Sequence, residues 1–361
     1  MSMARVLVTG GAGYIGSHAV KALNAQGAQV VVYDDLSAGH REATSHASAL
    51  VVGDIHDSAR LRAAIREHQI EAVMHFAAWL SVGESVRDPV GYYRNNVAGT
   101  LSVLEAMVAE HVKYLVFSST AAVFGNPVET PIPESHPRRP INAYGQTKLA
   151  IEHALPHYET AYGIRSIALR YFNAAGADPD GELGEDHAPE IHLIPRAIDA
   201  ALGRDTFQVF GDDYDTPDGT CLRDFVHVND LASAHLLALE ALRNGAASTK
   251  YNLGNGRPTS VKDVVDSVER VVGRKVLFTK VVLALMTGRS AAEILDAQRA
   301  VHLTRMRELT ERKRAGDLAD AFASDYEIFH LEADLRWIEL AGDRVESLRA
   351  ILTEREGDRD G

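Results

Sequence analysis

The chain has 361 residues, of which 46% are hydrophobic and 24% charged, so it can bury an ordinary globular core and has room for about two domains. Its formal net charge of -13 argues against a general affinity for nucleic acid or for an anionic membrane surface. A single cysteine, Cys221, excludes an internal disulfide and a cysteine-rich metal site, and we expect no bound metal ion. The sequence shows no membrane-length apolar run and no leader-like start, so we expect a cytoplasmic protein.

A strand, a glycine turn and a helix are predicted at the start of the chain. Residues 5–10 are apolar and β-branched and end in glycine, and residues 17–26 have helical periodicity. Gly10, Gly13 and Gly16 lie between them in the pattern G-x-x-G-x-x-G. A tight turn, a bare backbone facing a pyrophosphate and close packing of helix on strand all require glycine, so the pattern indicates a dinucleotide-binding turn.

Two aspartates follow the next two predicted strands. The strand at residues 29–33 leads into Asp34, at the distance from the glycine turn where a carboxylate accepts hydrogen bonds from both ribose hydroxyls of an adenosine. A carboxylate there disfavours a 2′-phosphate, so we expect NAD rather than NADP. The strand at residues 50–55 carries Asp54 near its end, where it can meet the adenine amino group.

The alternation of helices and strands continues to residue 120. His75 lies within one of these strands and is expected to be a core histidine rather than a catalytic group. Strands alternating with helices predict an α/β fold of the Rossmann type, a doubly wound parallel sheet. The segments are a helix at 58–68, a strand at 72–78, a helix at about 95–110 and a strand at 114–120.

A tyrosine and a lysine stand four residues apart at the start of a long predicted helix. At this spacing Tyr144 and Lys148 share one helical face. The ammonium, aided by a cationic nicotinamide ring, is expected to lower the pKa of the phenol, which can then exchange a proton with a sugar hydroxyl. Such pairs are also common on exposed helices without any function. Thr120, at the end of its strand, is either a turn or cap residue or a hydroxyl that holds the substrate oxygen.

Several ordered motifs resemble those of the extended short-chain dehydrogenase/reductase superfamily. They are T-G-G-A-G-Y-I-G from Thr9, H-F-A-A from His75, Y-R-N-N-V from Tyr93, F-S-S-T-A-A-V-F-G from Phe117 and Y-G-Q-T-K from Tyr144. Within the superfamily, R-Y-F-N-A-A-G from Arg170 and residues 210–228 are similar to UDP-glucose 4-epimerases. The similarity covers residues 5 to about 275.

This resemblance implies a Rossmann domain that keeps NAD bound through turnover and a smaller lobe that binds a UDP-hexose. In that family the tyrosine, here Tyr144, takes the proton of the sugar 4-hydroxyl while hydride passes to NAD, and the 4-keto sugar turns over and is reduced on its other face. Lys148 would tune Tyr144 and hold the nicotinamide ribose, and Thr120 stands where the family generally has serine. The implied cofactor contacts are Gly10, Gly13, Tyr14, Ile15, Gly16, Asp34, Asp54, Ile55, Phe76, Ala77, Asn95, Lys148 and Phe172.

The resemblance also implies a set of substrate contacts. They are Thr120, Tyr144, Asn173, His192, Leu193, Gln208 and Phe210 on a predicted strand at 208–210, and Arg223. Arg223 suits a phosphate because a guanidinium fork matches phosphate oxygens, although a salt bridge to Asp224 is the alternative. Nucleotide-sugar dehydratases are similar but carry Asp-Glu after the threonine, where this chain has Ala121 and Ala122, so elimination is not expected.

The chain is expected to divide into three parts. The NAD-binding Rossmann domain takes residues 1–175, with residues of about 220–255 returning to it, and residues 176–275 form mainly the substrate lobe. A predicted helix at 261–272 should end at Gly273, where the similarity to the epimerases stops. A helical region follows at 280–355.

Two long amphipathic helices are predicted in this last region, one at residues 291–314 and one along an apolar stripe from Leu318 to Leu352, longer than about 30 residues. D-A-Q-R from Asp296 and F-H-L-E-A-D-L-R-W from Phe329 resemble the C-terminal helical domain of PadR-type regulators, in which such helices pair two protomers. A homodimer is therefore expected. The DNA-reading half of those regulators has no counterpart here, so no nucleic acid is expected as a partner.

The expected function is NAD-dependent epimerisation of a UDP-hexose at C4. One alternative is a non-catalytic nucleotide-sugar-binding or assembly protein, because the helical tail replaces the end of the substrate lobe. Another is a different NAD-dependent nucleotide-sugar epimerase. Arg314 and Asp317 match the R-x-G-D substrate loop of the epimerases, but they lie between two predicted helices, so coincidence is favoured.

Overall fold

The computed structural model describes residues 4–286 and 290–357. The chain forms two compact units. One unit comprises the chain up to Arg196 together with Gln208–Val264, and the other comprises Ala197–Phe207 together with the chain from Val265 onward. The division into three functional parts near residues 175 and 275 is kept as a proposal.

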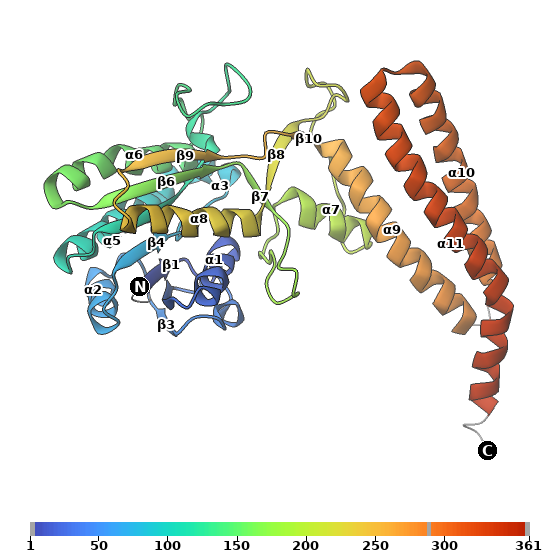
Figure 1. Cartoon of the computed structure of the whole chain (residues 1–361), viewed down its shortest axis with the longest axis horizontal. Coiled ribbons are helices and arrows are strands. Elements are labelled where there is room, and N and C mark those ends of the chain that lie inside the picture. Colours follow the sequence, from blue (N-terminus) through green and yellow to red (C-terminus); the bar gives the residue numbers. More distant parts are fainter. Residues whose placement is uncertain (1–3, 287–289, 358–361) are drawn as a thin grey trace. The chain divides into compact units, whose positions relative to one another are not determined.

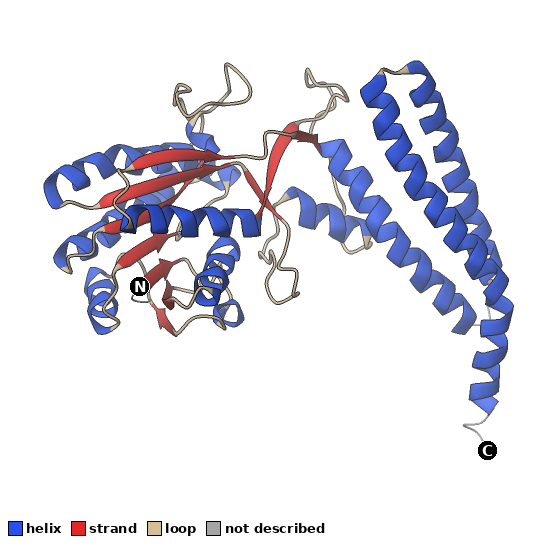
Figure 2. Ribbon diagram, in the orientation of Figure 1, coloured by secondary structure: helices blue, strands red, loops and turns tan. Residues whose placement is uncertain are grey.

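A parallel sheet of seven strands forms the centre of the first unit (Figures 1 and 2). The strands lie in the order β3-β2-β1-β4-β5-β6-β9, so the winding direction reverses between β1 and β4. Ligands of such sheets bind at the carboxyl ends of the strands beside this reversal. The predicted Rossmann-type fold is confirmed. The strands are β1 (Arg5–Thr9), β2 (Gln29–Asp34), β3 (Ala49–Val52), β4 (Ala72–His75), β5 (Tyr114–Thr120), β6 (Arg165–Tyr171) and β9 (Thr249–Leu253).

Helices cover both faces of this sheet because successive strand residues point to opposite sides. Val6 and Val8 belong to a buried cluster with residues of α1 (Tyr14–Ala25) and α8 (Val228–Arg243). Leu7 belongs to the other cluster, formed with α2 (Ser58–Glu67), α5 (Gly99–Ala109) and α6 (Ala143–Tyr162). Short helical segments are η1 (Arg41–Thr44), α3 (Val82–Arg87), α4 (Pro89–Tyr92), the π-helical turn η2 (Tyr93–Ala98) and η3 (Ala121–Val123).

Several predicted boundaries are too long. The third and fourth strands end at Val52 and His75, so Asp54, Ile55, Phe76 and Ala77 lie in the turns that follow. The helix predicted from about Asn95 begins as the turn η2 and becomes regular at α5. These turns carry the residues at the carboxyl edge of the sheet, where the backbone must leave the ladder to meet a ligand.

A second, small sheet has the order β10-β8-β7, from β7 (Asn173–Ala175), β8 (Leu222–His227) and β10 (Pro258–Ser260). β7 and β8 are parallel, and β8 and β10 are antiparallel. The strand predicted at residues 208–210 is wrong, because these residues have no regular structure. The side chain of Phe210 is 75% exposed, so it lacks the half-buried surface on which strand propensity depends.

The second unit is helical over the part of the chain that is described. It contains the end of α7 (Leu193–Ala201), most of α9 (Val261–Met286), α10 (Ala291–Ala315) and α11 (Leu318–Gly357), and α10 and α11 lie antiparallel side by side (Figure 1). The buried residues that join these helices are Val281, Ala291, Leu295, Ile338 and Val345.

One predicted helix end in this unit is wrong. α9 continues through Gly273 to Met286, because a glycine inside a helix costs only about 1 kcal/mol relative to alanine and cannot stop an otherwise favourable helix. The sequence Thr-Gly-Arg at residues 287–289, from which a turn is also expected, lies outside the described residues. The two final helices are confirmed, and α11 has 40 residues. Among the described helices, none is long and apolar enough to cross a bilayer.

Candidate functional site

The glycine turn crosses the point where the sheet reverses. Gly10 has a φ of +73°, and a Cβ atom on it would lie 2.5 Å from the backbone nitrogen of Ala77, which follows β4. A Cβ on Gly16 would lie 2.2 Å from the carbonyl oxygen of Gly10, whereas one on Gly13 would have no atom nearer than 3.5 Å. Packing therefore requires glycine at two positions. At the third position, Gly13, the backbone is open. It lies directly before α1, which begins at Tyr14 and has the positive end of its helix dipole there, so this surface fits a pyrophosphate.

The carboxylate of Asp34 lies at the end of β2, beside this turn. Its Oδ2 accepts a hydrogen bond from the backbone nitrogen of Ala12 at 3.0 Å, and its Oδ1 accepts one from that of Leu36 at 2.9 Å. Burial raises the pKa of Asp34, and these two hydrogen bonds oppose the rise. Each oxygen keeps a further lone pair, so the carboxylate can accept from two ribose hydroxyls. The residues present fit NAD at this position.

Asp54 and Ile55 lie farther along the same edge. Oδ1 of Asp54 accepts from the backbone nitrogen of His56 at 2.8 Å and lies 2.7 Å from Nδ1 of that histidine. The backbone hydrogen bond from His56 is a main reason why the pKa of Asp54 is lowered, although burial opposes it. The side chain of Ile55 is buried in the core.

The remaining predicted cofactor contacts follow strands or begin helices. The Tyr14 hydroxyl donates to the carbonyl oxygen of Gly176 at 2.6 Å. Ile15 and Phe76 pack against the cluster beneath α1 and α8. Asn95 lies in η2, and Phe172 directly follows β6. These positions place most of the predicted set at the carboxyl edge of the sheet.

Tyr144 and Lys148 lie in the first turns of α6, which Asn142 begins by accepting a hydrogen bond from the backbone nitrogen of Gly145 at 2.8 Å. Lys148 is 3% exposed, and its Nζ donates to the carbonyl oxygen of Ser118 at 2.8 Å. Thr120 is the last residue of β5, and its Oγ1 accepts from the backbone nitrogen of Ala122 at 3.1 Å. Thr120 is therefore a cap for η3, as one alternative held, while its own proton remains available to donate.

The pKa values in this group differ from the expectation. Burial raises the pKa of Tyr144, and a hydrogen bond with the Thr120 side chain lowers it only in part. Burial also lowers the pKa of Lys148 to about 7. The predicted lowering of the tyrosine pKa by the lysine is thus wrong for the protein alone, because removal from water disfavours the charged form of both groups. A cationic ring placed beside Tyr144 would act in the opposite direction.

His75 is a core histidine, as predicted. Its Nδ1 lies 2.6 Å from the Thr9 hydroxyl and its Nε2 lies 2.8 Å from the Thr100 hydroxyl. Burial, and to a smaller extent Lys148, lower the pKa of His75 to about 3. The neutral ring, hydrogen-bonded to both hydroxyls, ties β4 to β1 and to α5.

The predicted substrate contacts are spread over several segments of the chain. Asn173 lies in β7, His192 and Leu193 lie at the start of α7, and Gln208 and Phe210 are in the irregular segment described above. The Arg223 guanidinium in β8 is exposed and donates to Sγ of Cys221 at 2.6 Å and to the carbonyl oxygen of Leu222 at 2.9 Å.

The salt bridge considered for Arg223 is not formed with Asp224 within the described chain. The Asp224 carboxylate accepts from the backbone nitrogens of Asn255 and Gly256, at 2.8 and 2.9 Å. This arrangement ties β8 to the loop after β9 and leaves the guanidinium on the surface.

A cavity of about 480 Å³ lies between β8, α8 and the end of β9. None of the residues that line it was predicted as a contact of the cofactor or the substrate, although a Cβ on the lining residue Gly254 would lie 3.2 Å from the ring of Phe172. Residues of the lining include Gly176, Phe225, His227, Asn252, Gly254 and Asn255.

A buried ion pair behind the tyrosine was not predicted. The Arg170 Nε donates to Oε1 of Glu152 at 2.8 Å, and the Ser119 hydroxyl donates to the same oxygen at 2.6 Å. Both charged side chains are almost fully buried. Because Glu152 is in α6 while its partners are in β5 and β6, the pair holds the helix of Tyr144 on the sheet.

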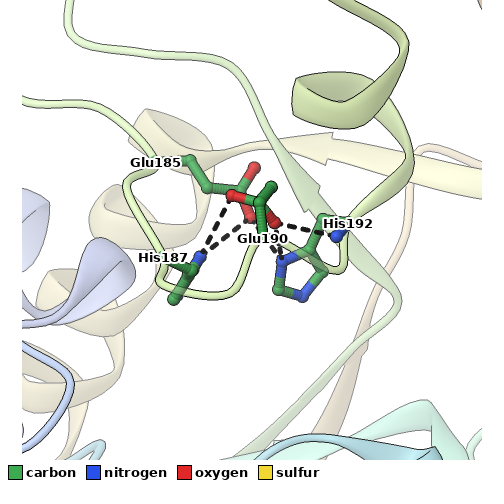
Figure 3. Close-up of side chains that lie close together, drawn as sticks. All are labelled: Glu185, His187, Glu190 and His192. Atoms are coloured by element: carbon green, nitrogen blue, oxygen red, sulfur yellow. Dashed lines mark hydrogen bonds and ion pairs between the residues drawn. The ribbon is translucent and has the colours of Figure 1, made fainter. Parts of the chain in front are cut away.

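A second group that was not predicted contains two histidines and two glutamates, Glu185, His187, Glu190 and His192 (Figure 3). The motif E-x-H-x-x-E-x-H in an irregular segment is a signal that would have revealed it. Glu185 and Glu190 raise the pKa of His192 against the effect of burial.

The R-x-G-D match is part of the turn between α10 and α11. The Asp317 carboxylate accepts from the backbone nitrogen of Asp320 at 3.0 Å, a hydrogen bond that caps the first turn of α11. Arg314 is exposed in the last turn of α10. This capping role accounts for the aspartate without a substrate.

Comparison with known proteins gives one consistent result. The family described as "NAD dependent epimerase/dehydratase family" matches residues 6–254. The UDP-glucose 4-epimerase of Halalkalibacterium halodurans is 53% identical over 272 residues, which are 75% of this chain and 81% of that protein. The crystal structure of the UDP-glucose 4-epimerase of Brucella ovis in complex with NAD has a TM-score of 0.73 and 54% identity, and covers 74% of this chain and 82% of its own. The enzyme of Bifidobacterium longum in complex with NAD+ and UDP has a TM-score of 0.70 and 38% identity, and covers 74% and 83%.

Proposed function

Because the chain belongs to the NAD dependent epimerase/dehydratase family, we propose that it is an isomerase that epimerises a UDP-hexose at C4 with NAD. The reaction passes through a 4-keto sugar. The observation that carries the proposal is the joint placement of Tyr144, Lys148 and Thr120 at the ends of α6 and β5, in a unit whose glycine turn and Asp34 fit NAD.

The cofactor is held by the first half of the sheet. The open backbone at Gly13 and the N-terminus of α1 would bind the pyrophosphate, and Asp34 would accept the adenosine ribose hydroxyls. NAD, when bound, supplies a reversible hydride acceptor for C4 of the sugar. The Asp34 carboxylate would repel the 2′-phosphate of NADP, so the site favours NAD over NADP.

The proton of the sugar 4-hydroxyl is assigned to Tyr144. Thr120, hydrogen-bonded to Tyr144, would hold the same sugar oxygen, so that the proton moves along a short path. Lys148 is buried and has a pKa of about 7, so a modest electrostatic change suffices to charge it. A charged Lys148 would stabilise the phenolate.

The substrate class follows from the relatives, which are named UDP-glucose 4-epimerases, one of them in complex with UDP. UDP-glucose and UDP-galactose are therefore the proposed pair of substrates. We assign the diphosphate to Arg223, whose exposed fork suits phosphate oxygens. The further proposed contacts are Asn173, His192, Leu193, Gln208 and Phe210.

The proposal is tested by adding UDP-galactose to the purified protein and measuring UDP-glucose, together with absorbance of reduced nicotinamide. We expect NAD to be released when the protein is denatured and turnover to depend on Tyr144. The control is Tyr158→Phe, a change in the same helix away from its N-terminal end. Bound NAD without any turnover would favour the second candidate, a nucleotide-sugar-binding or assembly protein.

One observation favours that second candidate. The family match ends at residue 254, and the aligned region covers 82% of the Brucella ovis structure, so part of that enzyme has no aligned counterpart in this chain. A substrate lobe completed by other residues would bind a UDP-hexose more weakly. Measured affinity for UDP distinguishes a weak enzyme from a protein that only presents the helices.

A homodimer through the last two helices is part of the proposal. Leu318, Phe322, Tyr326 and Phe329 follow one face of α11 at steps of three and four, and each is at least 60% exposed. The opposite side of the helix packs on its neighbours through Ile338 and Val345. A second copy can bury this exposed stripe against its own, as in PadR-type helical domains, and sedimentation at tens of micromolar, about where weak helical dimers form, tests it.

We propose neither nucleic acid nor a membrane surface as a partner. The net charge of -13 disfavours nucleic acid and anionic membranes as partners. We infer a cytoplasmic location, which cell fractionation tests.

A further inference from the structure

The segment before α7 gathers two histidines and two carboxylates in one small volume. One ligand atom from each of Glu185, His187, Glu190 and His192 lies within 4.8 Å of all the others, and all four side chains are partly buried. Figure 3 shows both histidine rings turned toward the two carboxylates. We propose that these four residues bind one divalent transition-metal ion, with zinc as the best match.

The spacing of the atoms suits a metal. Nδ1 of His192 lies 2.8 Å from Oε1 of Glu185 and 3.1 Å from Oε1 of Glu190, and Nδ1 of His187 lies 3.6 Å from an oxygen of each. Ligands at ~2.0–2.2 Å from a tetrahedral zinc ion are about 3.4 Å from one another. The four measured separations between histidine nitrogens and carboxylate oxygens bracket this value, and one ligand atom from each residue lies within 4.8 Å of the others.

The state of His187 supports the same conclusion. Its Nδ1 is buried and has no hydrogen-bond partner within the described residues, although it faces two carboxylate oxygens at 3.6 Å. A buried ring nitrogen without a hydrogen bond is uncommon, and a metal ion between it and the oxygens would satisfy it. Two imidazoles and two carboxylates form a mixed nitrogen and oxygen set, which suits zinc better than magnesium or calcium.

A neighbouring acidic cluster behaves differently and provides the control. Asp178, Asp180 and Glu182 also lie close together, but the Lys21 ammonium already sits among them at 2.7, 2.9 and 2.8 Å. In that cluster a cation of the protein already occupies the place between the carboxylates. Glu185 and Glu190, in the part of the chain that the structure describes, have ion pairs with the two histidines alone.

The ion would connect two parts of the first unit. The His187 ring meets the Tyr14 ring edge-on at 6.5 Å, so the cluster lies against the glycine turn. His192 immediately precedes α7, and coordination through Nδ1 would leave its Nε2–H as a fixed hydrogen-bond donor. The metal would therefore act as a structural clamp on the loop that carries a proposed substrate contact.

The test uses the full chain, stripped with a chelator and titrated calorimetrically with zinc chloride, and the bound metal is counted by elemental analysis after dialysis. The parent is expected to bind one zinc per chain more tightly than any further ions and to unfold at a higher temperature with zinc than without. His187→Gln and Glu185→Gln should each weaken this site by at least ~10- to 100-fold, since even the loss of a supporting residue costs that much. Asp180→Asn, in the cluster that Lys21 occupies, should bind zinc like the parent.

Two results would overturn the proposal. One is zinc affinity in the His187→Gln variant equal to that of the parent, which would place the metal elsewhere among the 16 histidines of the chain. The other is no binding by the parent at micromolar zinc, which would leave the cluster as an ion-pair network only. Because Glu185→Gln changes one atom of the side chain and Asp180→Asn changes one in the same way, unfolding curves without metal show whether a loss is due to misfolding.

Discussion

Replacing Gly10 by alanine tests the close approach that shapes the proposed cofactor site. Gly163 provides a matched control, because it has a φ of +71° against +73° at Gly10, but a Cβ on it would meet no atom within 4 Å. Both changes place alanine in the left-handed region at a cost of ~1–2 kcal/mol, and both recover ~0.4–1 kcal/mol through lower entropy of the unfolded chain. The Gly163→Ala variant should therefore lose about 1 kcal/mol of unfolding free energy.

Gly10→Ala should cost more, because its methyl group would lie 2.5 Å and 2.8 Å from backbone atoms of Ala77, which cannot rotate away. Overpacking of this kind costs ~1–3 kcal/mol beyond the conformational term. The assay is urea denaturation of the two variants without cofactor, followed by titration with NAD. We expect the gap in stability between the variants, and weaker NAD binding for Gly10→Ala alone. Equal stability of the two variants would refute the argument that the turn touches the end of β4.

Further outcomes are expected at four positions. Asp34→Ala should loosen NAD by ~1–3 kcal/mol, because two ribose hydroxyls lose their acceptor, and titration of the variant with NAD measures this loss. Tyr144→Phe should reduce epimerisation by at least ~100-fold with NAD still bound, as a coupled assay of UDP-glucose will show. Replacing Glu152 by alanine leaves a buried guanidinium unpaired and should cost ~3–5 kcal/mol in urea denaturation. Lys148 has a pKa of about 7 in the folded protein against 10.5 in the unfolded chain. Between these pH values the unfolded chain binds more protons, so the free energy of unfolding should rise with pH, and Lys148→Met should flatten this rise in urea denaturation.

Local patterns in the sequence were enough to predict the sheet, the glycine turn and the pair of final helices. β-branched runs that end in glycine or aspartate are typical of the strands of such a sheet. A strand that helices cover on both faces must be apolar, and ligands bind at the carboxyl ends of the strands. The same holds for α11, because an apolar stripe that repeats every three to four residues has no other regular conformation. Asp34, Tyr144 and Lys148 could be proposed as site residues because each has a fixed spacing from such an element.

Only the tertiary structure decided features that depend on groups distant along the chain. The pKa of Tyr144 is raised by burial, and the burial of one side chain depends on every element packed around it. The ion pair of Glu152 with Arg170 and the absence of a strand at residues 208–210 likewise depend on which segments become neighbours. The cluster around His187 needs its irregular segment to bend back on itself. Periodicity carries information about one face of one element, whereas a site on a loop is defined by contacts that no local repeat encodes.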